Sequence, residues 1–296
     1  MGAKIKPIRL VVQALSFASI SGLLSAALSK AIAPIPVPLP ILANPGGPST
    51  LPGALEAIEA LLSRAKAPLA AMAMVFIIGA LAGRAFCGWV CPFGFIQDLL
   101  RLISRTRRRM APMDHSFLSK LKYLILLASL FISASLALSY GFAWGESYRS
   151  ALGPLASGPF SSISPAGIKP PELLRQIASS ASEGRLGEWA MGLSRATLAG
   201  LALLAIAVYG GLKVPRFWCR YFCPTGALMG LFGRVSFLGI GRRPARCDRC
   251  ASCEAACPMQ VPILSLPWQR FNHQDCIACL ECSDACPHGA IGPKFS

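Results

Sequence analysis

The chain has 296 residues, of which 54% are apolar and only 14% are charged, and its formal net charge is +16. Soluble domains carry about 25% charged residues, so a soluble globule of this size is disfavoured. The high hydrophobicity also excludes a disordered chain. Three classes remain: a protein that binds nucleic acid, one that binds an anionic membrane surface, and an oriented integral membrane protein.

Four long apolar stretches predict four transmembrane helices, at about residues 10–29, 67–86, 121–145 and 189–212. A hydrocarbon core of about 30 Å needs about 20 helical residues, and each stretch is of that order. Buried core helices are the alternative, which four such stretches in one chain disfavour. For the first stretch a cleaved signal peptide is a further alternative, but the apolar run exceeds the roughly 7–15 residues typical of one.

The charges give the predicted topology. Most of the 29 Lys and Arg residues fall in segments that face inward if the N-terminus is inside. This positive-inside asymmetry places the N-terminus and the C-terminal region on the cytoplasmic side of the plasma or inner membrane. The arginines at 105 and 107–109 are interpreted as an orientation signal that touches anionic lipid headgroups. A nucleic-acid patch is the alternative, but no nucleic-acid motif accompanies them, and no such partner is expected.

The segment before the second stretch combines two patterns. Residues 31–53 are rich in proline, which predicts an extended connection. In residues 54–66, apolar and charged residues alternate at helical spacing. That pattern predicts a helix that lies along the membrane surface.

The strongest motif is a repeated cysteine pattern near the C-terminus. Two C-x2-C-x2-C-x3-C-P runs begin at Cys247 and Cys276, the spacing of bacterial ferredoxins with two 4Fe–4S clusters. In such ferredoxins the fourth cysteine of each run ligates the other cluster. We therefore predict one cluster on Cys247, Cys250, Cys253 and Cys286, and a second on Cys276, Cys279, Cys282 and Cys257. Structural zinc is the alternative, but zinc sites use C-x2–4-C pairs rather than such quartets.

These motifs divide the chain into two predicted domains. Residues 1–240 form an α-helical integral membrane domain whose four transmembrane helices make two related halves. Residues 241–296 form a small α+β two-cluster ferredoxin-like domain. They are too few for a large apolar core, so the clusters are expected to hold this domain together.

The other four cysteines lie in two matching segments, RAFCGWVCPFG from Arg84 and RFWCRYFCPTG from Arg216. Each carries C-x3-C-P-x-G where a predicted span reaches the inner side, which indicates an internal repeat. Thiols at i and i+4 share one helix face, and the proline that follows favours the start of the next helix. If the halves pack together, four thiols converge at the membrane edge: Cys87, Cys91, Cys219 and Cys223.

Three interpretations of these four thiols stay open. They are a third iron–sulfur or iron site, a redox-active or sensing thiol set, and buried positions without a ligand. Nearby arginines are expected to lower the thiol pKa values, namely Arg84, Arg216 and Arg220.

The histidines bear on two further expectations. No haem is expected, because no histidine lies in a predicted span and the C-x-x-C-H motif is missing from the sequence; the three histidines are His115, His273 and His288. For His115 an ordinary interfacial role is favoured over a proton relay. His288 follows Cys-Pro in the second cysteine run and is interpreted as local structure.

Across nearly its whole length the chain resembles the NapH/MauN ferredoxin-type membrane proteins. The resemblance rests on the four predicted helices, the two C-x3-C-P segments and the two-cluster motif, and CDRCASCEAACP is particularly similar. It implies an electron-transfer subunit of a quinol dehydrogenase-type oxidoreductase. Such a subunit oxidises quinol and passes electrons between the quinone pool and a redox partner protein of iron–sulfur or cytochrome type.

Related families imply an alternative function. NosR-type regulators and cytochrome oxidase accessory proteins share parts of this layout. The alternative is therefore an assembly, maturation or redox-regulatory membrane ferredoxin that supports a metalloenzyme.

Overall fold

The computed structural model describes residues 5–20, 41, 53–104, 112–140, 142, 145–160 and 195–295. A helical region comes first, and a small module that begins at Leu238 follows it. The helices of the first region are α1 (Ile5–Ile20), α3 (Ala54–Leu62), α4 (Leu69–Ala82), α5 (Ala85–Trp89), α6 (Pro92–Ser104), α7 (Pro112–Ser139), α8 (Gly145–Leu152), α12 (Arg195–Lys213), α13 (Phe217–Tyr221) and α14 (Pro224–Phe232). The elements of the module are β1 (Leu238–Arg242), α15 (Ser252–Ala256), α16 (Glu281–Asp284) and β2 (Ile291–Phe295).

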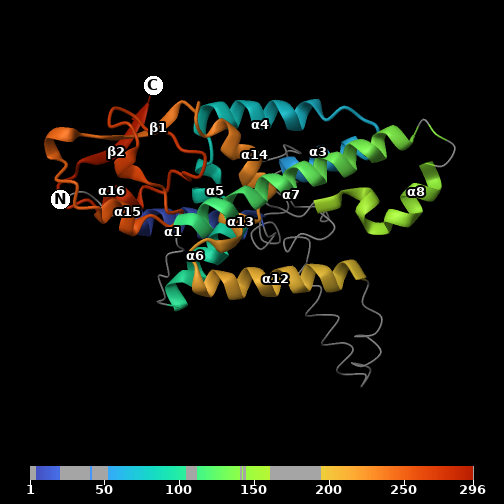
Figure 1. Ribbon diagram of the computed structural model, residues 1–296, viewed down its shortest axis with the longest axis horizontal. Helices are drawn as coiled ribbons and strands as arrows, with labels where there is room; N and C mark the ends of the chain where they lie inside the picture. Colours follow the sequence, from blue (N-terminus) through green and yellow to red (C-terminus); the bar gives the residue numbers. More distant parts are fainter. Residues whose placement is uncertain are drawn as a thin grey trace, which may run out of the picture.

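Figure 1 shows how the two regions are arranged. The helices α4, α7 and α12 run along the long axis of the molecule. The module lies at one end of them and α8 lies at the other. The short helices α5 and α13 lie between the module and the long helices, so the C-x3-C-P segments sit where the two regions meet.

The helix α7 corresponds to the third predicted span. Among the described residues, Asp114–Ser139 is the one helical stretch long and apolar enough to cross a membrane. It begins and ends earlier than the predicted residues 121–145. The chain turns after Ser139, where Tyr140 N–H donates to the carbonyl of Ala137, and a new helix begins at Gly145.

The other three predicted spans are described in part. The helix α4 covers Leu69–Ala82 rather than residues 67–86, because Gly83 ends it with a φ of +55°, a conformation that glycine adopts without strain. The helix α12 covers Arg195–Lys213 of the fourth span, whose residues 189–194 lie outside the described residues. The helix α1 ends at Ile20, and residues 21–29 also lie outside them. Four membrane crossings therefore stay a prediction.

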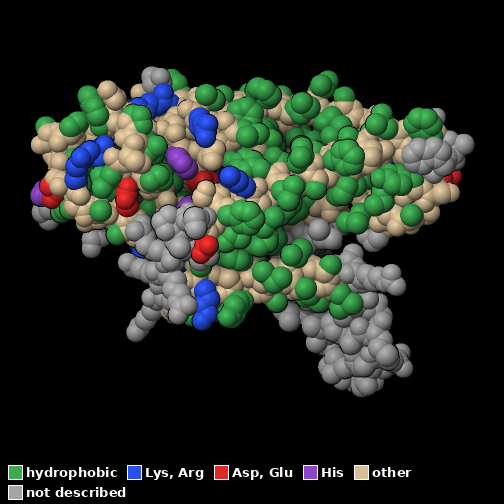
Figure 2. Space-filling model, viewed as in Figure 1, with side chains coloured by type: hydrophobic (Ala, Val, Ile, Leu, Met, Phe, Trp, Pro, Cys, Tyr) green, Lys and Arg blue, Asp and Glu red, His purple; other side chains and the backbone are tan. Residues whose placement is uncertain are grey.

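The long helices present an apolar surface. Leu69 on α4 is 72% exposed, Phe131 on α7 is 74% exposed and Tyr209 on α12 is 67% exposed. In Figure 2 hydrophobic side chains cover these helices, whereas most of the charged side chains on this face gather at the module end. Apolar surface of this extent is uncommon on a soluble monomer, and it fits contact with lipid.

The helix α3 lies inside the helical region and not on its surface. It packs against α4 and α7, and Leu55, Glu56 and Glu59 are each at most 1% exposed. The helix predicted in residues 54–66 is confirmed over Ala54–Leu62, but its predicted place on the surface is wrong. The alternating pattern assigned the charged positions to water, but neighbouring helices cover them. Burial raises the pKa of Glu56 to about 8, so this carboxyl holds its proton at neutral pH.

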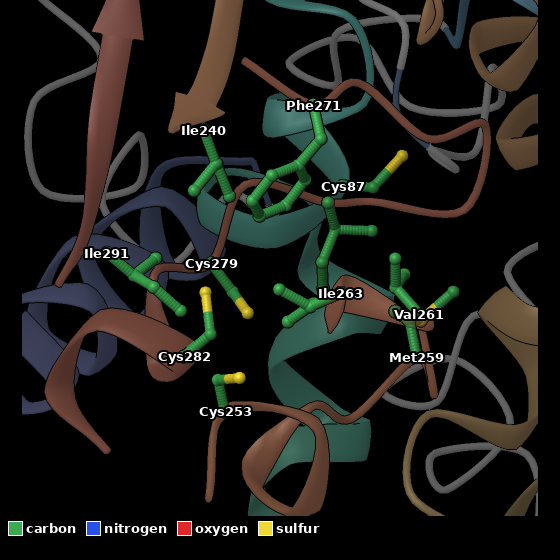
Figure 3. Packing of buried hydrophobic residues seen from close by; sticks show 11 residues of the cluster. Cys87, Ile240, Cys253, Met259, Val261, Ile263, Phe271, Cys279, Cys282 and Ile291 are labelled. Atoms are coloured by element: carbon green, nitrogen blue, oxygen red, sulfur yellow. The ribbon is translucent and has the colours of Figure 1, made fainter. Parts of the chain in front are cut away.

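The module is built around one antiparallel strand pair. In it β1 pairs with β2, with Leu238 opposite Phe295 and Arg242 opposite Ile291. Its core joins apolar residues to cysteines of both motifs; the labelled members in Figure 3 are Ile240, Met259, Val261, Ile263, Phe271, Ile291, Cys253, Cys279, Cys282 and Cys87. Because Cys87 comes from α5, the core of the module is continuous with the C-x3-C-P segments.

Candidate iron–sulfur sites

The two C-x3-C-P segments adopt the same backbone turn. Cys91 N–H donates to the carbonyl of Phe86 at 2.9 Å, and Cys223 N–H donates to that of Trp218 at 3.0 Å. The proline after each second cysteine opens the next helix, α6 or α14, which confirms the predicted helix starts. Proline suits this first helical position because its missing N–H would have had no intrahelical partner.

The four thiols of these segments converge. A single small cavity is lined by Cys87, Cys91, Cys219 and Cys223, together with Ile41, Arg84, Phe93, Trp218, Thr225 and Gly226. Each of the four cysteines is at most 6% exposed. We call this the interface site. The two halves therefore do pack together, and they contribute two thiols each.

Two arginines cross between the halves. The Arg84 guanidinium donates to the carbonyl of Cys219 at 3.0 Å, and the Arg216 guanidinium donates to that of Cys87 at 2.7 Å. Each arginine therefore fixes the first cysteine of the other segment. This reciprocal pairing is the clearest structural trace of the internal repeat.

The repeat is broken at the carboxylates that neutralise these arginines. Arg216 makes a bidentate contact with Asp98 on α6, at 3.0 and 2.5 Å. Arg84 instead pairs at 3.2 Å with Asp275, which belongs to the module. The counterpart of Asp98 in the second half is Gly230. A Cβ atom at Gly230 would lie 2.9 Å from the carbonyl oxygen of Gln274, so this glycine makes room for the module loop that supplies the carboxylate.

The electrostatics of the interface site are dominated by burial. Burial, and next the nearby Cys91, raise the pKa of Cys219 to about 12. Burial, and next the neighbouring Cys219, also raise the pKa of Cys223. The prediction that the arginines lower the thiol pKa values is therefore wrong as a net effect. Arg216 and Arg84 do favour the Cys219 thiolate, but burial outweighs them.

Two donors point at these sulfur atoms. The Gln97 side-chain amide lies 3.1 Å from Cys219 Sγ, and Gly226 N–H lies 3.3 Å from Cys223 Sγ. Metal ligation requires thiolates and releases their protons. An iron–sulfur cluster fits this arrangement of converging thiols, buried arginines and hydrogen bonds to sulfur. Hydrogen bonds to the sulfur atoms help to set the reduction potential of such a cluster.

In the module, one predicted ligand set surrounds a cavity. The four cysteines that line it are Cys257, Cys276, Cys279 and Cys282, which is the set predicted for the second cluster. Of the other set, Cys253 is buried and lies in the same core, Cys250 is exposed, and Cys247 and Cys286 are intermediate. Figure 3 shows Cys253 near Cys279 and Cys282, so the two sets adjoin.

The two cysteine runs share an unusual backbone. Arg249 and Ala251 in the first run, and Ala278 and Leu280 in the second, all have a φ between +47° and +59°. Such a left-handed conformation costs energy for residues other than glycine, and it turns successive N–H groups into an anion-binding concavity. Further N–H groups reach Cys257 Sγ from Val261 at 3.4 Å and Cys286 Sγ from Ala290 at 3.3 Å. This donor set fits a dianionic 4Fe–4S cube.

The described residues hold no group of three or more His, Cys, Asp or Glu side chains arranged around a single metal ion. A site of that kind needs its sulfur ligands within about 2.3 Å of one ion. A cube instead takes one thiolate at each of four irons.

Comparisons with known proteins agree with these sites. A 4Fe–4S binding domain model matches residues 65–110 and 196–243, which contain the two C-x3-C-P segments. A 4Fe–4S dicluster domain model matches residues 246–291. No solved structure was found that matches the chain.

Among curated relatives, the uncharacterized protein MJ0749 of Methanocaldococcus jannaschii is 29% identical over 74% of this chain and 67% of its own length. The ferredoxin-type protein NapH of Escherichia coli is 25% identical over 72% of this chain and 63% of NapH. The methylamine utilization ferredoxin-type protein MauN of Methylobacillus flagellatus is 25% identical over 72% of this chain and 62% of MauN.

The chain belongs to the NapH/MauN-type 4Fe–4S proteins. It is a ferredoxin-type electron-transfer protein associated with a membrane.

In this NapH/MauN-type chain the module is fastened directly onto the interface site. Trp89 Nε1 donates to the carbonyl of Ala278 at 3.0 Å, and Arg84 donates to that of Gln274 at 3.1 Å. A Cβ atom at Gly88 would collide with the carbonyl oxygen of Ile277. The loop that carries Cys276 and Cys279 therefore lies against α5, which carries Cys87.

A second set of contacts joins α1 and α6 to α16. Glu281 accepts hydrogen bonds from Arg9 at 2.8 Å and from Arg101 at 2.8 and 2.9 Å. Arg9 also reaches Asp98 at 3.2 Å. The backbone N–H groups of Ile5 and Lys6 donate to the Asp284 carboxylate.

Sequence reasoning missed several residues of these sites. Gln97, Asp98 and Asp275 belong to no recognisable motif, although Asp98 is one of only two acidic residues between Arg84 and Lys122. Asp98 carries a negative charge at neutral pH and can therefore neutralise the buried Arg216. Burial raises the pKa of Asp98, but Arg216 and Arg9 outweigh it and lower the pKa to about 2. Of the histidines, His115 lies 3.1 Å from the Tyr221 hydroxyl and His288 lies 3.0 Å from Asp248.

Proposed function

We propose that this chain is the quinol-oxidising membrane subunit of an oxidoreductase and that it passes electrons between the quinone pool and a redox partner protein. The observation that carries this proposal is the continuity of its thiol sites. Cys87 of the interface site belongs to the same buried cluster as Cys253, Cys279 and Cys282 of the module. The sites thus follow one another from the membrane edge into the module.

The ligands would be distributed over three sites. The module would hold two clusters on the cysteine sets defined above, and the interface site would hold a third iron–sulfur centre on Cys87, Cys91, Cys219 and Cys223. Bound 4Fe–4S clusters supply one-electron transfer. Oxidation of one quinol to a quinone releases two electrons and two protons, so two oxidised centres would take one electron each and the protons would pass to water.

The rest of the chain would place these sites at the cytoplasmic face. The apolar surfaces of α4, α7 and α12 support insertion in lipid. The excess of Lys and Arg in the inward segments supports a cytoplasmic N-terminus and module. The arginines at 105 and 107–109, which would contact lipid headgroups, lie outside the described residues.

Anaerobic reduction by a quinol tests this function. The full chain is purified in nanodiscs, its clusters are reconstituted and oxidised, and decylubiquinol or a menaquinol analogue is added. The EPR signal of reduced 4Fe–4S centres is expected to appear within the mixing time of the quinol. Clusters that dithionite reduces but that neither quinol reduces would overturn the proposal.

The assembly or regulatory alternative separates from this one in a gene deletion. If the chain transfers electrons during turnover, the deletion stops electron flux while the partner enzyme keeps its full metal content. A partner that lacks its metal in the deletion strain would favour the alternative.

A further inference from the structure

Gln97 on α6 is a buried amide that reaches from the first half of the repeat into the second. It is 1% exposed. Its Oε1 atom accepts a hydrogen bond from the backbone N–H of Trp218 at 3.0 Å, and its Nε2 atom donates to Cys219 Sγ at 3.1 Å. One side chain of the first half therefore contacts two consecutive residues of the second.

These two contacts determine which end of the amide faces the sulfur atom. The nitrogen and oxygen of a glutamine amide exchange places by a half-turn of the side chain, and the hydrogen-bond network decides between the two orientations. The Trp218 N–H lies in the first turn of α13, where it has no intrahelical partner. Because an N–H can only donate, the amide oxygen must face Trp218. The NH2 group is then held toward Cys219 Sγ as a fixed donor.

The repeat does not reproduce this donor in the second half. Counted from the matched residues Cys87 and Cys219, the counterpart of Gln97 is Met229. The thioether of methionine has no hydrogen to donate, and Met229 lies in the apolar cluster that also contains Ile58. The two halves therefore supply one cysteine with an amide donor and one without the equivalent donor.

The backbone turn of the C-x3-C-P segment does not require a glutamine. The first segment makes the same turn at Phe86 as the second makes at Trp218. Phe86 packs against the apolar cluster that contains Met229. Support of the turn therefore does not explain why an amide stands at Gln97, and its contact with the sulfur atom does.

A donor at a ligand sulfur has a definite electrostatic effect on an iron–sulfur centre. Reduction adds one electron and hence one negative charge, and an N–H dipole aimed at the ligand favours the more negative form. Hydrogen bonds to the sulfur atoms are one of the factors that set such potentials. Each cysteine of the interface site is at most 6% exposed, so water screens this interaction little.

We propose that Gln97 raises the reduction potential of the centre at the interface site by donating to the Cys219 thiolate. The inference rests on one part of the proposed function, the third iron–sulfur centre on the four cysteines of that site. Gln97 contacts the ligand and not the centre, so it is a positioning residue that acts through Cys219. With this donor the interface site accepts an electron more readily than its four thiolates would alone.

An anaerobic redox titration followed by EPR measures this potential in the full chain in nanodiscs. Dithionite and mediator dyes replace quinol, and the interface signal is the one that the variant Cys91→Ala/Cys223→Ala lacks. Gln97→Met introduces the residue of the second half and removes the donor. Met229→Leu is the matched control, because it changes the equivalent buried residue and no donor.

We expect Gln97→Met to make reduction of the interface centre at least about tenfold less favourable, which lowers a one-electron potential by about 59 mV. The module centres of this variant, and all centres of Met229→Leu, should stay within about twofold, or about 18 mV. An unchanged interface potential in Gln97→Met would overturn the inference, as would an equal shift in Met229→Leu. A wild type whose EPR signals all persist in Cys91→Ala/Cys223→Ala would overturn it too.

The outcome is distinguishable from that of the proposed function. If quinol reduces the chain but Gln97→Met leaves the interface potential unchanged, the inference alone fails. If Gln97→Met lowers the potential in a chain that quinol does not reduce, the proposed function alone fails.

A spectroscopic measurement on the wild type keeps the test valid if Gln97→Met does not assemble its centres. The chain is made by cell-free synthesis with 15N only in the glutamine side chains, and it is studied by pulsed EPR after reduction. A 15N hyperfine coupling on the interface signal is expected, because the Gln97 amide bonds directly to a ligand sulfur. An interface signal without this coupling would overturn the inference.

Discussion

The interface site and the module hold their cysteines in opposite ways. In the interface site four thiols from two distant segments are gathered by packing, each at most 6% exposed, and by arginines that cross between the halves. In the module the spacing within two short runs gives the predicted ligands, and one of them, Cys250, is exposed. The first site depends on the tertiary fold, whereas the second is encoded locally. We therefore expect the two regions to respond differently when a cysteine is replaced.

The largest expected difference lies in what one lost cysteine does to the surrounding fold. Cys279→Ala should open the module, because a small domain organised by metal loses most of its folding free energy with the metal. Cys223→Ala should leave the helical region folded, because apolar neighbours such as Leu126 and Trp218 surround this position. Limited proteolysis under anaerobic conditions is the measurement, with cleavage sites mapped by mass spectrometry. If each variant is cleaved equally in its own region, the module does not depend on its cysteines more than the helical region does.

The arginine that crosses from the second half provides the next test. Among the described residues, Arg216→Met leaves the buried Asp98 with Arg9 and Gln13 as partners, and the loss of one partner from a buried ion pair costs about 3–5 kcal/mol. The midpoint of chemical unfolding measures this loss. Arg234→Met is the control, since Arg234 is exposed and such a change shifts stability by about 0.5 kcal/mol or less. Equal midpoints for the two variants would show that the crossing arginine does not hold the halves together.

The buried Glu56 predicts a pH dependence that belongs to the helical region. Its pKa is raised from 4.5 to about 8, so its contribution to stability is fully present below pH 4.5 and is lost as the pH rises toward 8. Between these values the slope approaches about 1.4 kcal/mol per pH unit. Thermal unfolding between pH 5 and about 8 should show this decline in the wild type and in the exposed control Glu146→Gln, but not in Glu56→Gln. A slope that persists in Glu56→Gln would refute the assignment.

The smallest expected effect concerns the joint between the two regions. Trp89→Phe removes the hydrogen bond to the carbonyl of Ala278, which is worth about 1 kcal/mol. Faster hydrogen exchange is expected for residues 276–282 alone. Trp268→Phe is the control, because Trp268 is 48% exposed on the module. If both variants exchange alike, this contact does not fasten the module.

The same contrast explains what the sequence could predict. The spacing that begins at Cys247 and Cys276 identified a set of four cysteines that lines one cavity, because the relevant geometry is local. The repeat predicted that Cys87 and Cys219 would meet, because the two segments share an arginine followed by the C-x3-C-P-x-G pattern. Long apolar runs located the long helices, although helix ends moved where Gly83 and Ser139 stop them.

Other features could not be predicted because they arise only from tertiary contact. Asp275 replaces the carboxylate that Gly230 lacks, and it comes from another part of the chain. The burial of Glu56 depends on how α3 packs against α4 and α7, and the sequence of that segment looks amphipathic. The raised pKa of Cys219 likewise follows from burial that a count of nearby arginines does not reveal.

The central claim is that the interface site holds a cluster of its own beside the two of the module. The most direct measurement is iron and acid-labile sulfide per chain, with EPR of the reduced protein, in the wild type and in the variant Cys91→Ala/Cys223→Ala. The account predicts about twelve of each in the wild type and about eight in the variant, four for each 4Fe–4S cube. About eight of each in both proteins would contradict it.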